Sequence, residues 1–66
     1  MQITVNNKQH ETGEGTTIAA LISELGYSQK GVAAAINKTV ILRSQWESYV
    51  LSEGAELIIF QATQGG

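Results

Sequence analysis

The residues with the most distinctive chemistry stand at the end of the 66-residue chain, which closes with Gln64, Gly65 and Gly66. A terminal carboxyl group has a pKa of about 3.3–3.7, so at neutral pH it is ionised and a weak electrophile. Chain ends ordinarily fray, but this one directly follows an apolar run, residues 57–60, that is typical of an anchored strand. The last carboxylate is therefore a candidate reactive group that would need activation by another molecule.

Glycine suits such an end because it lacks a Cβ atom. The backbone of a second protein can approach Gly65 and Gly66 closely, and unusual φ/ψ angles cost them little. Residues 62–66, fully extended, reach about 17 Å at ~3.3–3.6 Å per residue. That length is enough to thread a narrow channel while the folded body stays outside.

The remaining side chains suggest no catalytic or metal-binding cluster. His10 is the only histidine and there is no cysteine, which leaves too few ligands for a structural zinc site. Gly13-Glu14-Gly15 lacks the further glycines or the lysine of a phosphate-binding loop. The five serines have no evident His/Asp partners. We therefore expect no metal, no bound cofactor and no catalytic activity of the chain's own.

Size and charge exclude several classes of protein. A chain of 66 residues forms one small domain and hides only about 60% of its unfolded surface. The formal charge of −2 argues against nucleic acid, which requires a clustered basic surface. No apolar run approaches the roughly 20 residues that cross a bilayer, and residues 1–5 lack the charged region of a signal peptide. The expected location is the cytoplasm.

The first half of the chain predicts a hairpin and then a helix. Residues 1–5 alternate apolar and polar, which is typical of a half-buried strand, and residues 9–12 could return as its partner after an Asn-rich turn. Thr16 or Thr17 can cap a helix. Four apolar residues then follow at helical spacing, and Gly26 stands where a helix ends. These four are Ile18, Leu21, Ile22 and Leu25.

The second half predicts three more strands. Residues 32–36 are rich in alanine, but their length and flanking turns favour a short buried strand over a helix. Residues 40–42 are its hairpin partner, residues 43–49 are irregular or a short helical turn with Trp46 closing the core, and residues 57–60 are the last strand. The fold class is therefore α+β: a mixed sheet of four to five strands packed on one central helix.

Alternation in the last strand also predicts a surface. We assign Leu57 and Ile59 to the core, which places Ile58 and Phe60 on the open face of the sheet, close to the chain end. Exposed apolar neighbours of this kind mark a docking surface. The alternatives are that Arg43 and its neighbours cover them, or that a second copy does. Arg43 itself is expected to cap an element or to pair with a local carboxylate.

With these elements in order, the chain resembles the β-grasp, or ubiquitin-like, family and, within it, the ThiS-like sulfur carriers of thiamine thiazole biosynthesis. The resemblance covers the whole chain. It rests on the opening strand, on "AAINKTVILRSQW" in the middle, on a glycine turn before the last strand, and on Gly65-Gly66. Many members have proline at the position of Leu42 and aspartate at that of Ala55, so the chain departs from the family pattern there.

The resemblance implies a β-grasp domain over residues 1–61 and a flexible tail over residues 62–66. Gly66 would be adenylated with ATP by an E1-like, ThiF-like enzyme, converted to a thiocarboxylate with sulfur from a donor enzyme, and used by a ThiG-like thiazole synthase. Gly65 and Gln64 would thread the tail, and Ile58 and Phe60 would dock the partner. Two alternatives remain: the small subunit of molybdopterin synthase, and another ubiquitin-like modifier or interaction module.

Overall fold

The computed structural model describes residues 1–61. Its elements run in the order Gln2–Val5 (β1), Lys8–Glu11 (β2), Ile18–Glu24 (α1), Gln29–Gly31 (η1), Val32–Ile36 (β3), Thr39–Ile41 (β4), Arg43–Gln45 (η2) and Glu56–Gln61 (β5), where η1 and η2 are single 3₁₀ turns. The predicted order of strands and helix is confirmed, and η1 is an additional turn. The predicted tail, with Gln64, Gly65 and Gly66, lies outside the described residues.

All five strands join one sheet in the order β2-β1-β5-β3-β4. β5 lies at the centre, parallel to β1 and antiparallel to β3, and both outer pairs are antiparallel. The last strand in the sequence is thus held between the first strand and the third. The two outer strands are more polar or shorter than β5: β2 is entirely polar (KQHE), and β4 has only three residues. The predicted α+β class with a mixed sheet on one helix is confirmed.

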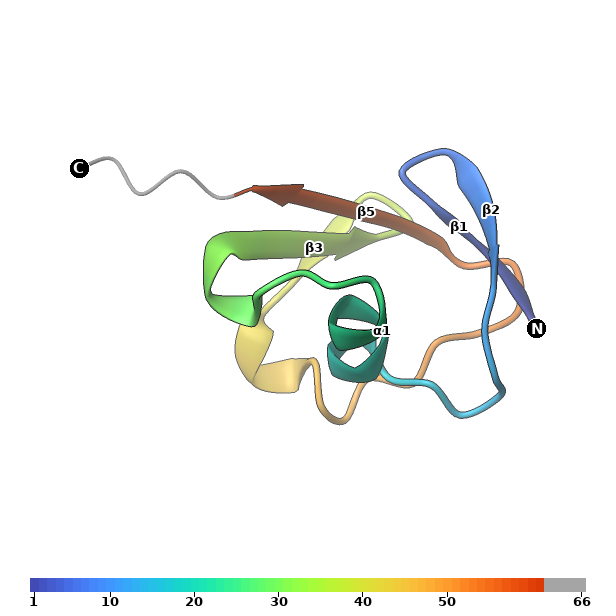
Figure 1. Cartoon of the computed structure of the whole chain (residues 1–66), viewed down its shortest axis with the longest axis horizontal. Helices are drawn as coiled ribbons and strands as arrows, with labels where there is room; N and C mark the ends of the chain where they lie inside the picture. The colour runs from blue at the N-terminus through green and yellow to red at the C-terminus, as the bar shows by residue number, and fades with distance from the viewer. Residues whose placement is uncertain (62–66) are drawn as a thin grey trace.

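The helix α1 packs against one face of this sheet (Figure 1). Thr17, rather than Thr16, is its N-cap: the Thr17 side chain accepts a hydrogen bond from the Ala20 amide at 3.1 Å. Gly26 has φ +87°, the left-handed conformation that ends a helix at low cost for glycine. The apolar stripe of α1 is thereby fixed toward the sheet.

The core lies between α1 and the sheet and is closed at one end by an aromatic side chain. Leu21 of α1 and Leu57 of β5 are fully buried, and Ile59 is 5% exposed. Trp46 is 1% exposed, and its indole Nε1 donates a hydrogen bond to the Ile41 carbonyl at 2.9 Å. Trp46 therefore closes the core as predicted, with its one polar group satisfied.

An asparagine in the β1–β2 turn holds the middle of β5. β1 pairs with β5 only through Thr4 and Val5. Beyond Val5 the Asn6 side chain replaces the strand pairing: its Oδ1 accepts a hydrogen bond from the Ile59 amide at 2.8 Å. Asn6 adopts φ 51°, which asparagine tolerates better than most residues. On the other side, pairing with β3 continues as far as Gln61, so β5 stays anchored to the last described residue.

Truncation of a core side chain tests this packing. Leu21→Ala should lower the free energy of unfolding by about 2–5 kcal/mol, because it removes buried methyl groups and leaves a cavity. This is a large part of the roughly 3–10 kcal/mol expected for a chain of this size. Denaturant titration followed by Trp46 fluorescence measures it. Ser23→Ala, on the exposed side of α1, should stay within about 0.5 kcal/mol of the parent; equal effects would contradict the packing.

A second variant tests the Asn6 anchor. Asn6→Gly keeps the positive φ accessible but removes the acceptor for the Ile59 amide, so it should cost about 1–3 kcal/mol and speed hydrogen exchange at that amide. Asn7→Gly is the matched control, because Asn7 also has positive φ (69°) but its side chain accepts no hydrogen bond within residues 1–61. If the Ile59 amide exchanges equally fast in both variants, the anchor is not made by Asn6.

Candidate functional site

The face of the sheet opposite α1 carries the apolar residues that the alternation of β5 predicts. Ile58 is 37% exposed and Phe60 is 45% exposed, whereas Leu57 and Ile59 between them are buried. The face assignment of all four residues is confirmed. A docking role for Ile58 and Phe60 stays a prediction, taken up below.

The register extends this apolar surface across β3 and β4. Ala35 of β3 pairs with Ile58 on one side and with Val40 on the other. Paired residues share a face of a sheet, so these three form one cross-strand row. The row begins at an outer strand and ends on the central one.

A second row lies next to the first, toward the end of β5. Ala33 pairs with Phe60. Leu42 immediately follows β4 and has an extended backbone (φ −63°, ψ 140°). Because Ala34 pairs with Ile41, continuing the register by one residue places Leu42 opposite Ala33. The two rows together form what we call the apolar patch: Ala33, Ala35, Val40, Leu42, Ile58 and Phe60.

The apolar patch has the form of a shallow trough. Its floor is made of alanines, and Ala35 is only 7% exposed although it lies on the open face. Its sides are Val40 and Leu42 (61% and 65% exposed) along one strand and Ile58 and Phe60 along the other. Within residues 1–61, four of the six exposed large apolar side chains gather here, and Tyr27 and Val50 are the other two. Such a concentration is common at binding surfaces, so the apolar patch is the candidate site.

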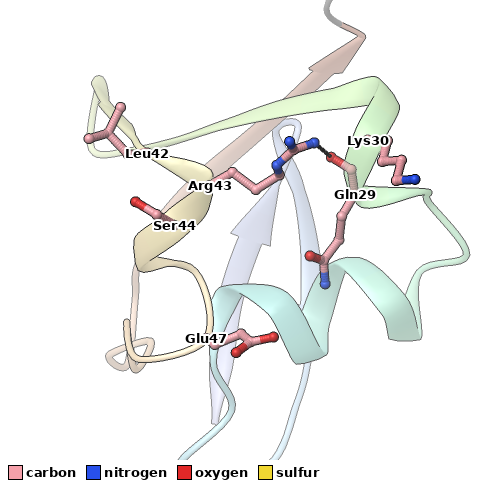
Figure 2. Close-up of a pocket in the computed structure, with 6 residues that line it drawn as sticks. All are labelled: Gln29, Lys30, Leu42, Arg43, Ser44 and Glu47. Carbon is pink, nitrogen blue, oxygen red and sulfur yellow. Dashed lines mark hydrogen bonds between the residues drawn. The ribbon is translucent and has the colours of Figure 1, made fainter.

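Arg43 does not cover this patch, and it has no carboxylate partner among residues 1–61. Its Nη1 donates a hydrogen bond to the Gln29 carbonyl at 3.3 Å, which joins η2 to η1 (Figure 2). The ion pairs in this part of the chain are Met1–Glu11 and His10–Glu24. Of the two expectations for Arg43, pairing with a local carboxylate is wrong within residues 1–61, whereas the bond to a backbone carbonyl of η1 agrees with the capping role.

The other polar residues of the described chain show no reactive arrangement. His10 Nε2 lies 3.1 Å from Glu24 Oε2, and this contact connects β2 with the end of α1. Within residues 1–61 no three His, Asp or Glu side chains gather as metal ligands would. Nor does any helix in that range have the length and apolar character needed to cross a bilayer.

Sequence reasoning found two members of the apolar patch and missed four. Ile58 and Phe60 follow from alternation within one strand. The sequence predicts a strand at Val40 and Leu42, but the face of the sheet on which they lie depends on the register between β3 and β4. A signal was present, because Ala33/Ala35 and Val40/Leu42 both have the spacing of two that puts side chains on one face.

Comparison with known proteins agrees with this geometry. The ThiS family model matches residues 1–66. The chain is 33% identical to the sulfur carrier protein ThiS of Escherichia coli K12 over 66 residues, which cover all of both chains. It is also 32% identical to a thiazole synthase of Magnetococcus marinus over 66 residues, and there it spans only 20% of the longer protein.

A solved structure supports the same assignment. The crystal structure of the thiamine biosynthesis protein ThiS from Geobacter metallireducens superposes with a TM-score of 0.87, at 25% sequence identity and with both chains covered in full. The fold, the length and the family model therefore agree along the whole sequence. The chain belongs to the ThiS family.

Proposed function

We propose that this chain is a sulfur carrier of thiamine thiazole biosynthesis, whose own last residue, Gly66, carries the sulfur while partner enzymes supply the catalysis. The observation that carries this proposal is the full-length match to a sulfur carrier protein. The structure adds a central strand, β5, that presents the apolar patch and leads directly toward the Gly-Gly end. The same match favours the thiazole pathway over the molybdopterin synthase alternative.

The chemistry starts from an unreactive carboxylate. On an E1-like, ThiF-like enzyme, an oxygen of the Gly66 carboxylate attacks the α-phosphorus of ATP, and pyrophosphate leaves. Sulfur at the oxidation level of hydrosulfide, delivered by a donor enzyme, then attacks the acyl carbon. The bond to the AMP oxygen breaks, AMP leaves and a proton is released. The product is a thiocarboxylate, and no redox change is needed. ATP is bound by the activating partner, so the carrier needs no cofactor of its own.

The consumer of the sulfur is a thiazole synthase in this scheme. A protein named thiazole synthase contains a segment similar to the whole of this chain, which supports a functional link between the two. Because loading uses ATP, we place the carrier in the cytoplasm.

The body and the tail have separate tasks. Gln64 and Gly65 extend the end into the partner's active site, where side chains would obstruct a narrow channel. Ordering each of these residues costs about 1–2 kcal/mol. Docking through Ile58 and Phe60, at the end of an anchored strand, offsets that cost by removing apolar surface from water.

Intact-mass spectrometry tests the proposed function. After incubation with the adenylating enzyme, ATP and a sulfide source, the protein should gain the mass difference between sulfur and oxygen. Gly65→Val should gain it at least tenfold more slowly, because a branched side chain hinders threading, and its unfolding curve should match the parent's. No gain in the parent chain would contradict the carrier function. A normal rate in Gly65→Val would contradict threading alone.

A second variant tests the docking surface. Phe60→Thr keeps a residue type that is common in strands but removes the ring, so kcat/KM for adenylation should fall about tenfold, mainly through KM. Val50→Thr is the matched control, because Val50 is 54% exposed but lies outside the apolar patch. Steady-state pyrophosphate release measures both. Equal kcat/KM values in the two variants would show that the partner docks elsewhere.

A further inference from the structure

An open groove separates η1 from η2 (Figure 2), with a volume of about 710 Å³. It is lined by Gln29, Lys30, Leu42, Arg43, Ser44 and Glu47. Its position follows from the sheet: Gly31 ends η1, the next residue is Val32, and Val32 pairs with Gln61 at the end of β5. The groove therefore lies at the end of the sheet where β3 begins and β5 finishes. Figure 1 shows these two strand ends side by side.

This end of the molecule is basic, although the chain as a whole is acidic. Lys30 and Arg43 are two of its four Lys/Arg residues, and Glu47 is the only acid that lines the groove. Carboxylates gather at the other end of β5 instead. Glu56 begins that strand, and Glu53 lies in the preceding turn, where it accepts a hydrogen bond from the Gln2 amide. Lys8 and Lys38 also lie toward that other end, so what distinguishes the groove is its local excess of two basic residues over one acid, where a partner that takes the chain end must approach.

Arg43 is held in place with most of its donors unused. A guanidinium has five N–H donors, and in the described chain it makes the one hydrogen bond to the Gln29 carbonyl. That bond holds the guanidinium across the groove, between the two turns (Figure 2). A planar group fixed in this way is suited to bind a carboxylate with two parallel hydrogen bonds.

The groove adjoins the apolar patch through one residue. Leu42 lines the groove and also belongs to the patch. A protein that covers the patch therefore reaches the groove without a gap. The two surfaces together have the composition usual in protein interfaces, with an apolar centre and a charged rim.

We propose that this groove binds a carboxylate side chain of the adenylating enzyme, next to apolar residues of that enzyme that cover the patch. The proposal rests on the carrier function proposed above. A protein is the occupant because the groove is open and five of its six lining residues are polar or charged, unlike the enclosed apolar pockets of small ligands. The phosphates of ATP are not the occupant, because the reacting end extends up to about 17 Å from the body.

The loading enzyme is the partner with the greatest need of this contact. It must distinguish the terminal carboxylate of this chain from those of all other proteins. Gly65 and Gly66 have no side chains that it could recognise. The consuming enzyme receives a thiocarboxylate, a rare group that distinguishes itself by its chemistry. Selection at the loading step therefore depends on the body next to the tail, where Arg43 and Lys30 lie.

Charge variants with a matched control test the groove. Lys30→Glu reverses one charge, and the Lys30 side chain makes no hydrogen bond or ion pair within residues 1–61. Arg43→Gln removes the other charge and, because its side chain is shorter, also the hydrogen bond to the Gln29 carbonyl. Lys8→Glu is the control, because Lys8 lies on β2, at the opposite edge of the sheet. Trp46 fluorescence checks that each variant is folded.

The readout is pyrophosphate release by the adenylating enzyme at increasing carrier concentration, in low and in high salt. In about 0.05 M salt, Lys30→Glu and Arg43→Gln should each lower kcat/KM about tenfold, with kcat nearly unchanged, because rim charges act mainly on association. In about 0.5 M salt the deficit should shrink, because the Debye length falls toward ~3 Å. Lys8→Glu should stay within about twofold of the parent.

Three results would overturn the proposal, and they are distinguishable. If Lys30→Glu and Arg43→Gln match Lys8→Glu while the parent chain releases pyrophosphate normally, the groove has no part in loading and the carrier function stands. If the parent chain itself releases no pyrophosphate, the carrier function fails, and the groove proposal fails with it. A deficit that persists unchanged in high salt would also contradict an ionic contact.

Discussion

The structure depends on the central position of β5, which is held on one side as far as Gln61 and on the other as far as Ile59. β3 pairs with it from Leu57 to Gln61, and on the other side β1 and then the Asn6 side chain hold it. This constraint fixes which residues of the strand face α1 and which face outward. It also fixes the place of Gln61, the last described residue, next to an apolar surface and a basic groove.

The core and the proposed docking surface thereby lie on opposite faces of one strand. Leu57 and Ile59 bury themselves against α1, while Ile58 and Phe60 remain available to a partner. A chain of this length has little apolar surface to spare. Exposure of two large side chains at the centre of the sheet lowers the stability of the fold, and the proposed docking role would account for it. The buried Trp46 and the N-capped helix α1 stabilise other parts of the fold.

The sequence alone allowed most of the fold and part of the site to be predicted, for reasons that are local. The alternation of residues 57–60 predicts which side chains of β5 face the core. The helical spacing of apolar residues before Gly26 predicts α1. The extent of the apolar patch was not accessible, because Val40 and Leu42 join it through the register between β3 and β4. The groove was missed as well. It depends on η1 and on an Arg43 contact with the Gln29 carbonyl, and neither has a distinct local pattern.

The two outer strands have a consequence for how the protein behaves at high concentration. An exposed apolar surface invites self-association, and unpaired strand edges make such association propagate into fibres. Here β2 presents only Lys, Gln, His and Glu, and β4 ends after three residues. Both edges are poor templates for adding a strand from another copy. The polar and short edges therefore oppose the growth of fibres even though the apolar patch stays exposed.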